Sequence, residues 1–230
     1  MMLDVLDFPA LAAVARHAPA APGADQAQTW LAAHGFHPAA VLALIAAGRL
    51  EKAEDACDAA PGGDSALALR ALARVRLGRA RSGEADARRV VAGGDPFAIA
   101  ALADALLERS APADAERWLA LAGPSPRWPE HLGHSFLLDT LARVRLAQRR
   151  APEALKLARE CARRQRALNV RNPGVVAWGS TLAAAAAATG RTGEALDAAD
   201  EQLDLARAFG VARPQRLALN VLAQITGAAA

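Results

Sequence analysis

LARVRL occurs twice in the chain, at residues 72–77 and again, without change, at residues 141–146. Each copy is followed by a short break that contains glycine or basic residues, and then by an acidic residue and an alanine that open a second helical pattern. Glycine favours the left-handed backbone that ends a helix, and an acidic side chain in the next first turn complements the helix dipole. The hexapeptide and its surroundings therefore predict a helix, a tight turn and a second helix.

The same break followed by an acidic residue and an alanine recurs along most of the chain. The alanines are separated by 32, 30, 39 and 41 residues and lie at Ala53, Ala85, Ala115, Ala154 and Ala195. Periods of this size are typical of solenoids built from helix pairs, and about 34 residues is the tetratricopeptide period. The sequence thus predicts an all-α fold, a tetratricopeptide-like right-handed solenoid of about five antiparallel helix pairs plus terminal helices.

Prolines help to place these helices, because proline is tolerated in the first turn of a helix and not in its interior. Several prolines stand at the expected helix starts. The expected pairs are 38–47 with 50–59, 64–77 with 83–91, 96–109 with 112–121, 130–148 with 152–168, and 173–189 with 193–209, and a last helix follows from about Arg213.

Two breaks divide the chain into four regions. Residues 1–24 are expected to hold a loosely attached helix, from about 9 to 17, and a proline-rich linker from 18 to 24. The shorter helical repeats follow at 25–122. A second proline-rich break at 123–129 precedes the longer repeats and the terminal helix, which together occupy 130–230.

Composition favours closely packed helices. The chain is 53% apolar, mostly through alanine, whereas aromatic residues make up 4% and tyrosine is absent, which suits a β-sandwich badly. The 27 basic and 24 acidic residues are too evenly balanced to require a nucleic-acid partner. No apolar run approaches the ~20 residues of a membrane span, no signal peptide is recognised, and two distant cysteines fit a reducing compartment. We therefore expect a cytoplasmic protein without a membrane partner.

The motifs of common enzymes and metal sites are missing from the sequence. There is no Gly-x-Ser-x-Gly elbow, no recognisable cysteine–histidine pairing and no phosphate loop, so we expect neither catalysis nor a cofactor. An enzyme that uses a pocket in the groove stays an open alternative, because fold does not settle function. His34 with His37, and His131 with His134, are each three residues apart, but no cysteine or clustered carboxylate completes either set, so no metal site is expected.

Polar residues in the first helices of the pairs are the first candidate site. Stacked helix pairs form a concave surface lined by their first helices, and such surfaces bind peptides or proteins. We expect this groove to receive a protein or peptide partner or a small effector, and to carry Arg70, Arg74, Asp139 and Arg143. The alternative is that these four are solvated helix residues.

A row of basic residues is the second candidate, here called the basic stripe. It consists of Lys156, Arg159, Arg163 and Arg166, whose spacing of three or four residues places them on one helix face. Such a stripe, within 156–171, can contact phosphates, so nucleic-acid binding is kept as an alternative. A solvated face is the more common meaning, because no aromatic residue is interleaved for base stacking.

A series of residues in the last third keeps the order and spacing of a known family: Arg171-Asn172-Pro173, Trp178, Ser180, Gly190-Arg191, Glu194-Ala195, Glu201, Leu203, Leu205-Ala206-Arg207, Gly210 and Pro214. Through this series, residues 137–223 resemble the helical-repeat region of the large ATP-binding LuxR-type (MalT-like) transcriptional regulators. Gly179 departs from the pattern, since the family commonly has arginine there. Trp178 is expected to be a packing residue because of its large apolar area.

The resemblance implies a role in signal-dependent transcription, with the repeats acting as a sensor and as a surface for self-association or inhibitor binding. The family's ATPase and its DNA-binding helix-turn-helix have no counterpart here, so the resemblance implies an excised or stand-alone repeat domain. Such a domain is expected neither to hydrolyse ATP nor to bind an operator by itself. A general scaffold or adaptor without a link to transcription is the alternative.

Overall fold

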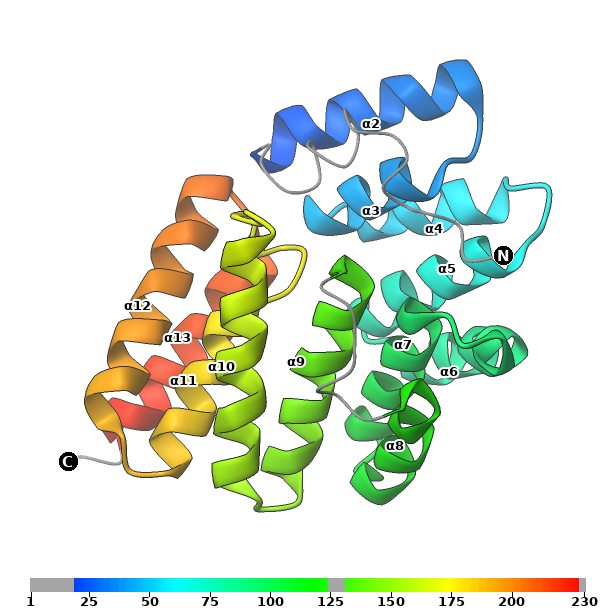
Figure 1. Ribbon diagram of the computed structural model, residues 1–230. Helices are drawn as coiled ribbons and strands as arrows, with labels where there is room; N and C mark the ends of the chain where they lie inside the picture. The colour runs from blue at the N-terminus through cyan, green and yellow to red at the C-terminus, as the bar shows by residue number, and fades with distance from the viewer. Residues whose placement is uncertain (1–18, 124–130, 228–230) are drawn as a thin grey trace.

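The computed structural model describes residues 19–123 and 131–227, and all the regular secondary structure of these residues is helical (Figure 1). Its α-helices are α2 (Ala20–His34), α3 (Pro38–Ala46), α4 (Leu50–Asp58), α5 (Asp64–Arg76), α6 (Ala80–Val90), α7 (Pro96–Glu108), α8 (Pro112–Leu119), α9 (Leu132–Ala147), α10 (Ala151–Ala167), α11 (Trp178–Ala188), α12 (Thr192–Phe209) and α13 (Ala212–Gly227). Short 3-10 turns extend α6 and α8, at Val91–Gly93 and Ala120–Ala122. The predicted all-α class is confirmed.

From α3 onward the helices form consecutive pairs, and most bounds agree with those expected to within three residues. The pairs are α3–α4, α5–α6, α7–α8, α9–α10 and α11–α12. The second helix of each pair packs on the first helix of the next, and the first helices of successive pairs also pack on one another. The first helices therefore form one continuous layer, to which α13 is added by its contact with α11.

The turn inside each pair has the same geometry five times. Its first residue has a positive φ in every pair, at Gly48, Gly78, Ser110, Arg149 and Gly190. The following residue donates its backbone N–H to the carbonyl oxygen five residues before it, over 2.8–2.9 Å. This is the Schellman ending of a helix, in which a left-handed residue lets the last carbonyls find donors. The expected glycine ending is thus confirmed at three turns, and Ser110 and Arg149 adopt it without a glycine.

Two segments differ from the expectation. Residues 20–24 were predicted to be linker, but α2 begins at Ala20 and buries Gly23, Ala24 and Ala27. Pro22 lies in the first turn, where a missing N–H breaks no helical hydrogen bond, so this proline marks a helix start and not a break. Residues 173–177 were expected to begin a helix, yet they form a turn in which the Asn172 side chain accepts the Gly174 N–H over 2.8 Å. The expected helix at 9–17 and most of the break at 123–129 lie outside the described residues.

The stack is closed by contacts between parts that are far apart in sequence. Gly174, in the turn before α11, lies so close to the end of α3 that a Cβ placed on it would be 1.8 Å from the Ala46 carbonyl oxygen. Arg76, at the end of α5, donates hydrogen bonds to the carbonyl oxygens of Gly174 (2.7 Å) and Val175 (2.6 Å). The curve of the stack in Figure 1 brings this turn beside α3. As a result, the first helices surround a common interior.

Apolar burial is continuous through the described chain, and a single cluster of buried residues extends from Ala24 in α2 to Ile225 in α13. Alanine supplies much of it, which lets neighbouring helices approach closely. None of the helices in the described part of the chain combines the length and apolar character needed to cross a lipid bilayer.

Candidate functional site

Four of the first helices and α13 line a partly open cavity of about 200 Å³, here called the inner cavity. Its polar lining consists of Arg76, Asp104, Asp139, Thr140, Arg143, Ser180, Thr181 and Arg213, and its apolar lining includes Phe136, Leu146, Val176, Leu217 and Val221. These residues come from α5, α7, α9, α11 with the turn before it, and α13. Concave sites with a few convergent polar groups among apolar ones are typical of small-ligand binding.

Arg143 is the most fully bonded group of the inner cavity. It lies one turn after Asp139 on α9, so both share a face, and its Nε donates to Asp139 Oδ2 over 3.0 Å. Its Nη2 donates to Asp104 Oδ1 of α7 over 2.7 Å, and Thr140 donates to that same oxygen over 2.8 Å. Burial alone would lower the pKa of Arg143, but Asp104 and Asp139 together raise it above its ordinary value. This guanidinium is therefore charged and held in place.

Arg76 also lines the inner cavity, and no carboxylate among the described residues forms an ion pair with it. Its two hydrogen bonds go to the neutral carbonyl oxygens of the turn before α11, and its guanidinium lies 5.4 Å from the centroid of the Phe136 ring. Burial lowers the pKa of Arg76, and the neighbouring charge of Arg213 lowers it further. The region around Arg76 thus disfavours positive charge.

Arg213 lies in the first turn of α13 and makes no hydrogen bond or ion pair with any residue that the structure describes. Burial lowers its pKa, and the charge of Arg143 lowers it further. The positive end of the α13 dipole also disfavours a cation at this position. An anion next to this guanidinium would offset the cost of burial, the repulsion by Arg143 and the unfavourable helix dipole.

Two lining groups are buried without a partner among the described residues. Asp139 and Ser180 are each more than nine-tenths buried, and neither Asp139 Oδ1 nor Ser180 Oγ has a hydrogen-bond partner among the described residues. Arg213 differs from these two groups, because it is half-buried and its guanidinium keeps some contact with solvent. The charged lining comprises three guanidinium groups and two carboxylates, which leaves one positive charge in excess.

The four residues predicted to line the groove fall into two places. Asp139 and Arg143 line the inner cavity, whereas Arg70 and Arg74, although also on a first helix, do not. The structure therefore does not bring the four together. Arg76, Asp104, Ser180, Thr181 and Arg213 were missed, and no local sequence signal distinguishes them from other polar helix residues.

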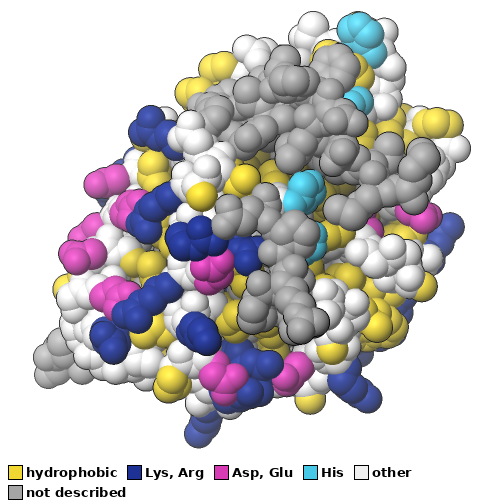
Figure 2. Space-filling view, in the orientation of Figure 1, with side chains coloured by type: hydrophobic (Ala, Val, Ile, Leu, Met, Phe, Trp, Pro, Cys, Tyr) yellow, Lys and Arg dark blue, Asp and Glu magenta, His cyan; other side chains and the backbone are white. Residues whose placement is uncertain are grey.

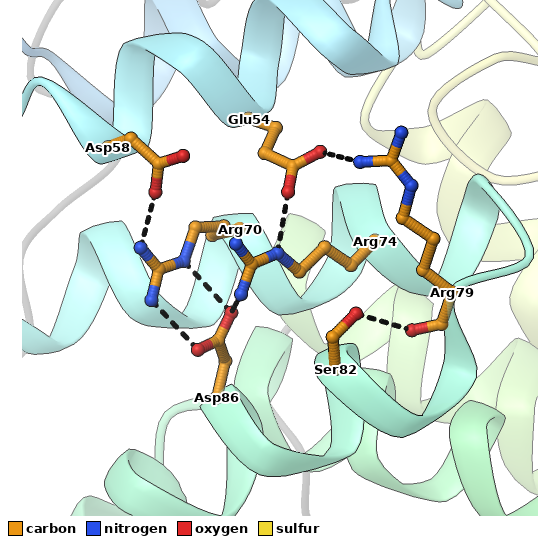
Figure 3. A network of polar contacts seen from close by, with 7 residues as sticks. All are labelled: Glu54, Asp58, Arg70, Arg74, Arg79, Ser82 and Asp86. Carbon is orange, nitrogen blue, oxygen red and sulfur yellow. Dashed lines mark hydrogen bonds and ion pairs between the residues drawn. The ribbon is translucent and has the colours of Figure 1, made fainter.

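Arg70 and Arg74 instead join α5 to its two second-helix neighbours, as Figure 3 shows. Arg70 bonds both oxygens of Asp86 on α6, over 2.8 and 2.9 Å, and also pairs with Asp58. Arg74 donates to Asp86 over 2.7 Å and to Glu54 of α4 over 2.7 Å. The hydrogen bond to Asp86 is the main cause that raises the pKa of Arg70. These side chains hold three helices together and have few donors left for a partner.

The basic stripe lies on α10 and is largely neutralised by carboxylates. Arg159 donates two hydrogen bonds to Glu194 of α12, over 2.8 and 2.6 Å, and Arg166 pairs with Glu201 of α12 over 2.8 Å. Arg163 pairs with Glu160 over 2.8 Å, while Lys156 is exposed. Figure 2 shows basic and acidic side chains interspersed over the left of this face, where Figure 1 places α10 and α12. The stripe is thus a row of ion pairs, and binding of nucleic acid by it stays a prediction.

Other reactive side chains are packed or stacked. Trp178 is buried, with the Arg166 guanidinium 4.7 Å from its ring centroid, so its predicted packing role is confirmed. Burial raises the pKa of the Cys57 thiol to about 12 and that of the Cys161 thiol well above its usual value. His34 stacks on Trp30 at 4.7 Å between ring centroids. Within 19–123 and 131–227, no group of three or more histidine, cysteine or acidic residues is placed to hold a metal ion.

No protein-family model matches the chain, and no curated protein shows a significant match to it. Nothing found in these comparisons links the chain to LuxR-type regulators. The kind of ligand must therefore be inferred from the chain's own side chains.

Proposed function

We propose that the chain is a non-enzymatic helical-repeat binding domain, a tetratricopeptide-like solenoid that receives an effector on the layer formed by its first helices. The repeated Schellman turn, at intervals of 30 to 41 residues, supports the repeat architecture. The packing of each first helix on the next supports a stack and not a closed bundle of unrelated helices.

The observation that carries the proposal is the convergence of five elements on the inner cavity, where Asp139 Oδ1 and Ser180 Oγ are buried without a partner among the described residues and the half-buried Arg213 pairs with none of them. A buried polar group without a partner costs about 1–3 kcal/mol, so a core built only for stability would place apolar side chains there. Ordered waters can satisfy such groups in part, and a ligand replaces those waters. A volume of about 200 Å³ suits a small effector better than a peptide.

We further propose that this effector site belongs to the sensor or interaction domain of a LuxR-type transcriptional regulator. Of the residues that carry the resemblance, Trp178 and Ser180 lie in α11 and Pro214 lies in α13, so one of them, Ser180, belongs to the cavity lining and another, Pro214, directly follows Arg213. Gly179 has a packing explanation: a Cβ there would lie 2.8 Å from Gln202 Oε1 and 3.0 Å from the Ala198 carbonyl oxygen. An arginine therefore does not fit while α12 packs this closely on α11.

A stand-alone scaffold or adaptor is the alternative function. It would use exposed surfaces and leave the inner cavity to water. The ion pairs of the basic stripe argue against nucleic-acid binding as the main function, because three of its four positive charges are already matched by Glu160, Glu194 and Glu201.

Filling the inner cavity tests the proposal. Ala184 of α11 lines the cavity, and Ala188 of the same helix is exposed, so Ala184→Leu and Ala188→Leu form a matched pair. Ligand-observed NMR with a mixture of small metabolites should find ligands that bind the native chain and the Ala188→Leu variant. The Ala184→Leu variant should lose that binding at least tenfold while its helical circular dichroism is kept. A folded Ala184→Leu variant that binds all the same ligands equally well would refute the proposal.

A further inference from the structure

We infer that the inner cavity binds a small monocarboxylate that also carries a hydrogen-bond donor, with its carboxylate on Arg213 and its donor on Asp139. The inference rests on the proposed function and specifies its ligand. A hydroxyl next to the carboxylate would supply the donor, and a short apolar side chain would contact Phe136 and Val221.

The carboxylate end follows from the state of Arg213. Its guanidinium has five N–H donors in a planar fork that matches the two oxygens of a carboxylate. No described residue accepts a hydrogen bond from these donors. Arg143 of α9, by contrast, already bonds Asp104 and Asp139. The single excess positive charge of the lining is balanced by one negative charge, which selects a monoanion over a neutral molecule.

The donor end follows from the carboxylate of Asp139. Its Oδ2 accepts from Arg143 over 3.0 Å, but its Oδ1 is buried without a partner among the described residues. An ionised carboxylate accepts hydrogen bonds and cannot donate them, so the ligand must bring an N–H or O–H. The Ser180 hydroxyl, which the same part of the chain also leaves without a partner, can bond to either end of such a molecule.

Glu108 is a further carboxylate whose negative charge acts on Arg213. It lies one turn after Asp104 on α7 and is exposed, and its pKa is raised by partial burial and by Asp104. Both Arg213 and Arg143 act on it electrostatically. It is not part of the cavity lining, so it provides a charge that repels an anionic ligand without touching it. Neutralising Glu108 should therefore tighten binding.

The test uses the full chain and calorimetric titration with lactate, with larger 2-hydroxy monocarboxylates, and with the neutral amide of each. At least one acid should bind, and its amide should bind at least tenfold more weakly. Arg213→Gln should weaken the acid at least tenfold, and Ser180→Ala should weaken it several-fold. Arg216→Gln, an exposed arginine one turn further along α13, should leave binding unchanged, and Glu108→Gln should strengthen it two- to fivefold.

Three outcomes would overturn the inference: no monocarboxylate binds, an amide binds as tightly as its acid, or Arg213→Gln binds the acid as the native chain does. These outcomes are separable from failure of the proposed function. If a neutral ligand or inorganic phosphate binds and Ala184→Leu abolishes that binding, the cavity is an effector site with a different ligand. If Ala184→Leu leaves all binding unchanged, the cavity is not the site.

Discussion

Gly174 marks the closest approach between two distant parts of the chain. Its φ does not require glycine, so the demand comes from space, since a Cβ would lie 1.8 Å from the Ala46 carbonyl oxygen and 2.8 Å from its carbon. Backbone atoms cannot move aside as the end of a flexible side chain can. A substitution at Gly174 therefore tests whether the turn before α11 contacts α3.

Gly174→Ala should destabilise the protein by about 1–3 kcal/mol, the usual cost of overpacking. Gly193→Ala is the matched control, because Gly193 lies in the first turn of α12 with an ordinary φ, and a Cβ added to it would meet no atom within 4 Å. Its effect should stay within about 1 kcal/mol. Urea denaturation with the slope held common would measure both. Equal midpoints for the two variants would contradict the contact with α3.

At the scale of the helix, the repeated hexapeptide shows what sequence could and could not predict. In the first copy the left-handed residue of the turn, Gly78, follows directly after residues 72–77, whereas in the second copy two further residues precede Arg149. Two residues rotate a helix by about 200°. The same arginine therefore faces α4 and α6 as Arg74, but faces the inner cavity as Arg143. Two identical hexapeptides thus place the same arginine against different neighbours.

Helix bounds were predictable because proline, glycine and acidic residues act locally, within one turn of a helix end. The lining of the inner cavity was not, because Arg76, Asp104 and Arg213 come from helices that meet only when the pairs stack. The groove hypothesis placed Arg70, Arg74, Asp139 and Arg143 on one surface of the first helices, but only Asp139 and Arg143 line the inner cavity. It could not decide which face of each helix points inward.

The turns make a prediction of their own. Ser110 and Arg149 have φ of 58° and 60°, values that cost an L-residue energy and glycine none, and both side chains are exposed. Ser110→Gly and Arg149→Gly should each stabilise the protein by about 0.5–1 kcal/mol. Gly78→Ala, at the equivalent place after α5, should destabilise it by a similar amount. Thermal denaturation of the three variants checks this, and a loss of stability in both glycine variants would show that the turns differ from those described.

On the scale of the whole molecule, Arg76 connects α5 to the turn before α11, two parts that are far apart in sequence. It belongs to α5, yet its two hydrogen-bond acceptors, the carbonyl oxygens of Gly174 and Val175, are 98 and 99 residues away in sequence. Stacked repeats otherwise contact only their neighbours, so distant repeats can unfold independently. The hydrogen bonds of Arg76 oppose such independent unfolding, because the helices that they join then lose stability together.

Native unfolding should therefore be a single transition when it is followed at Trp118 of α8 and at Trp178 of α11, in variants that keep one tryptophan and carry phenylalanine at the others. Arg76→Leu keeps the apolar volume but leaves both carbonyl oxygens without their donor, so the midpoint at Trp178 should separate from that at Trp118. Arg89→Leu, which removes an exposed arginine of α6, should keep the two midpoints together. Separate midpoints in the native background would mean that the closing contacts are too weak to couple the repeats. Coincident midpoints in Arg76→Leu would assign the coupling to the continuous alanine-rich core, which also runs from α2 to α13.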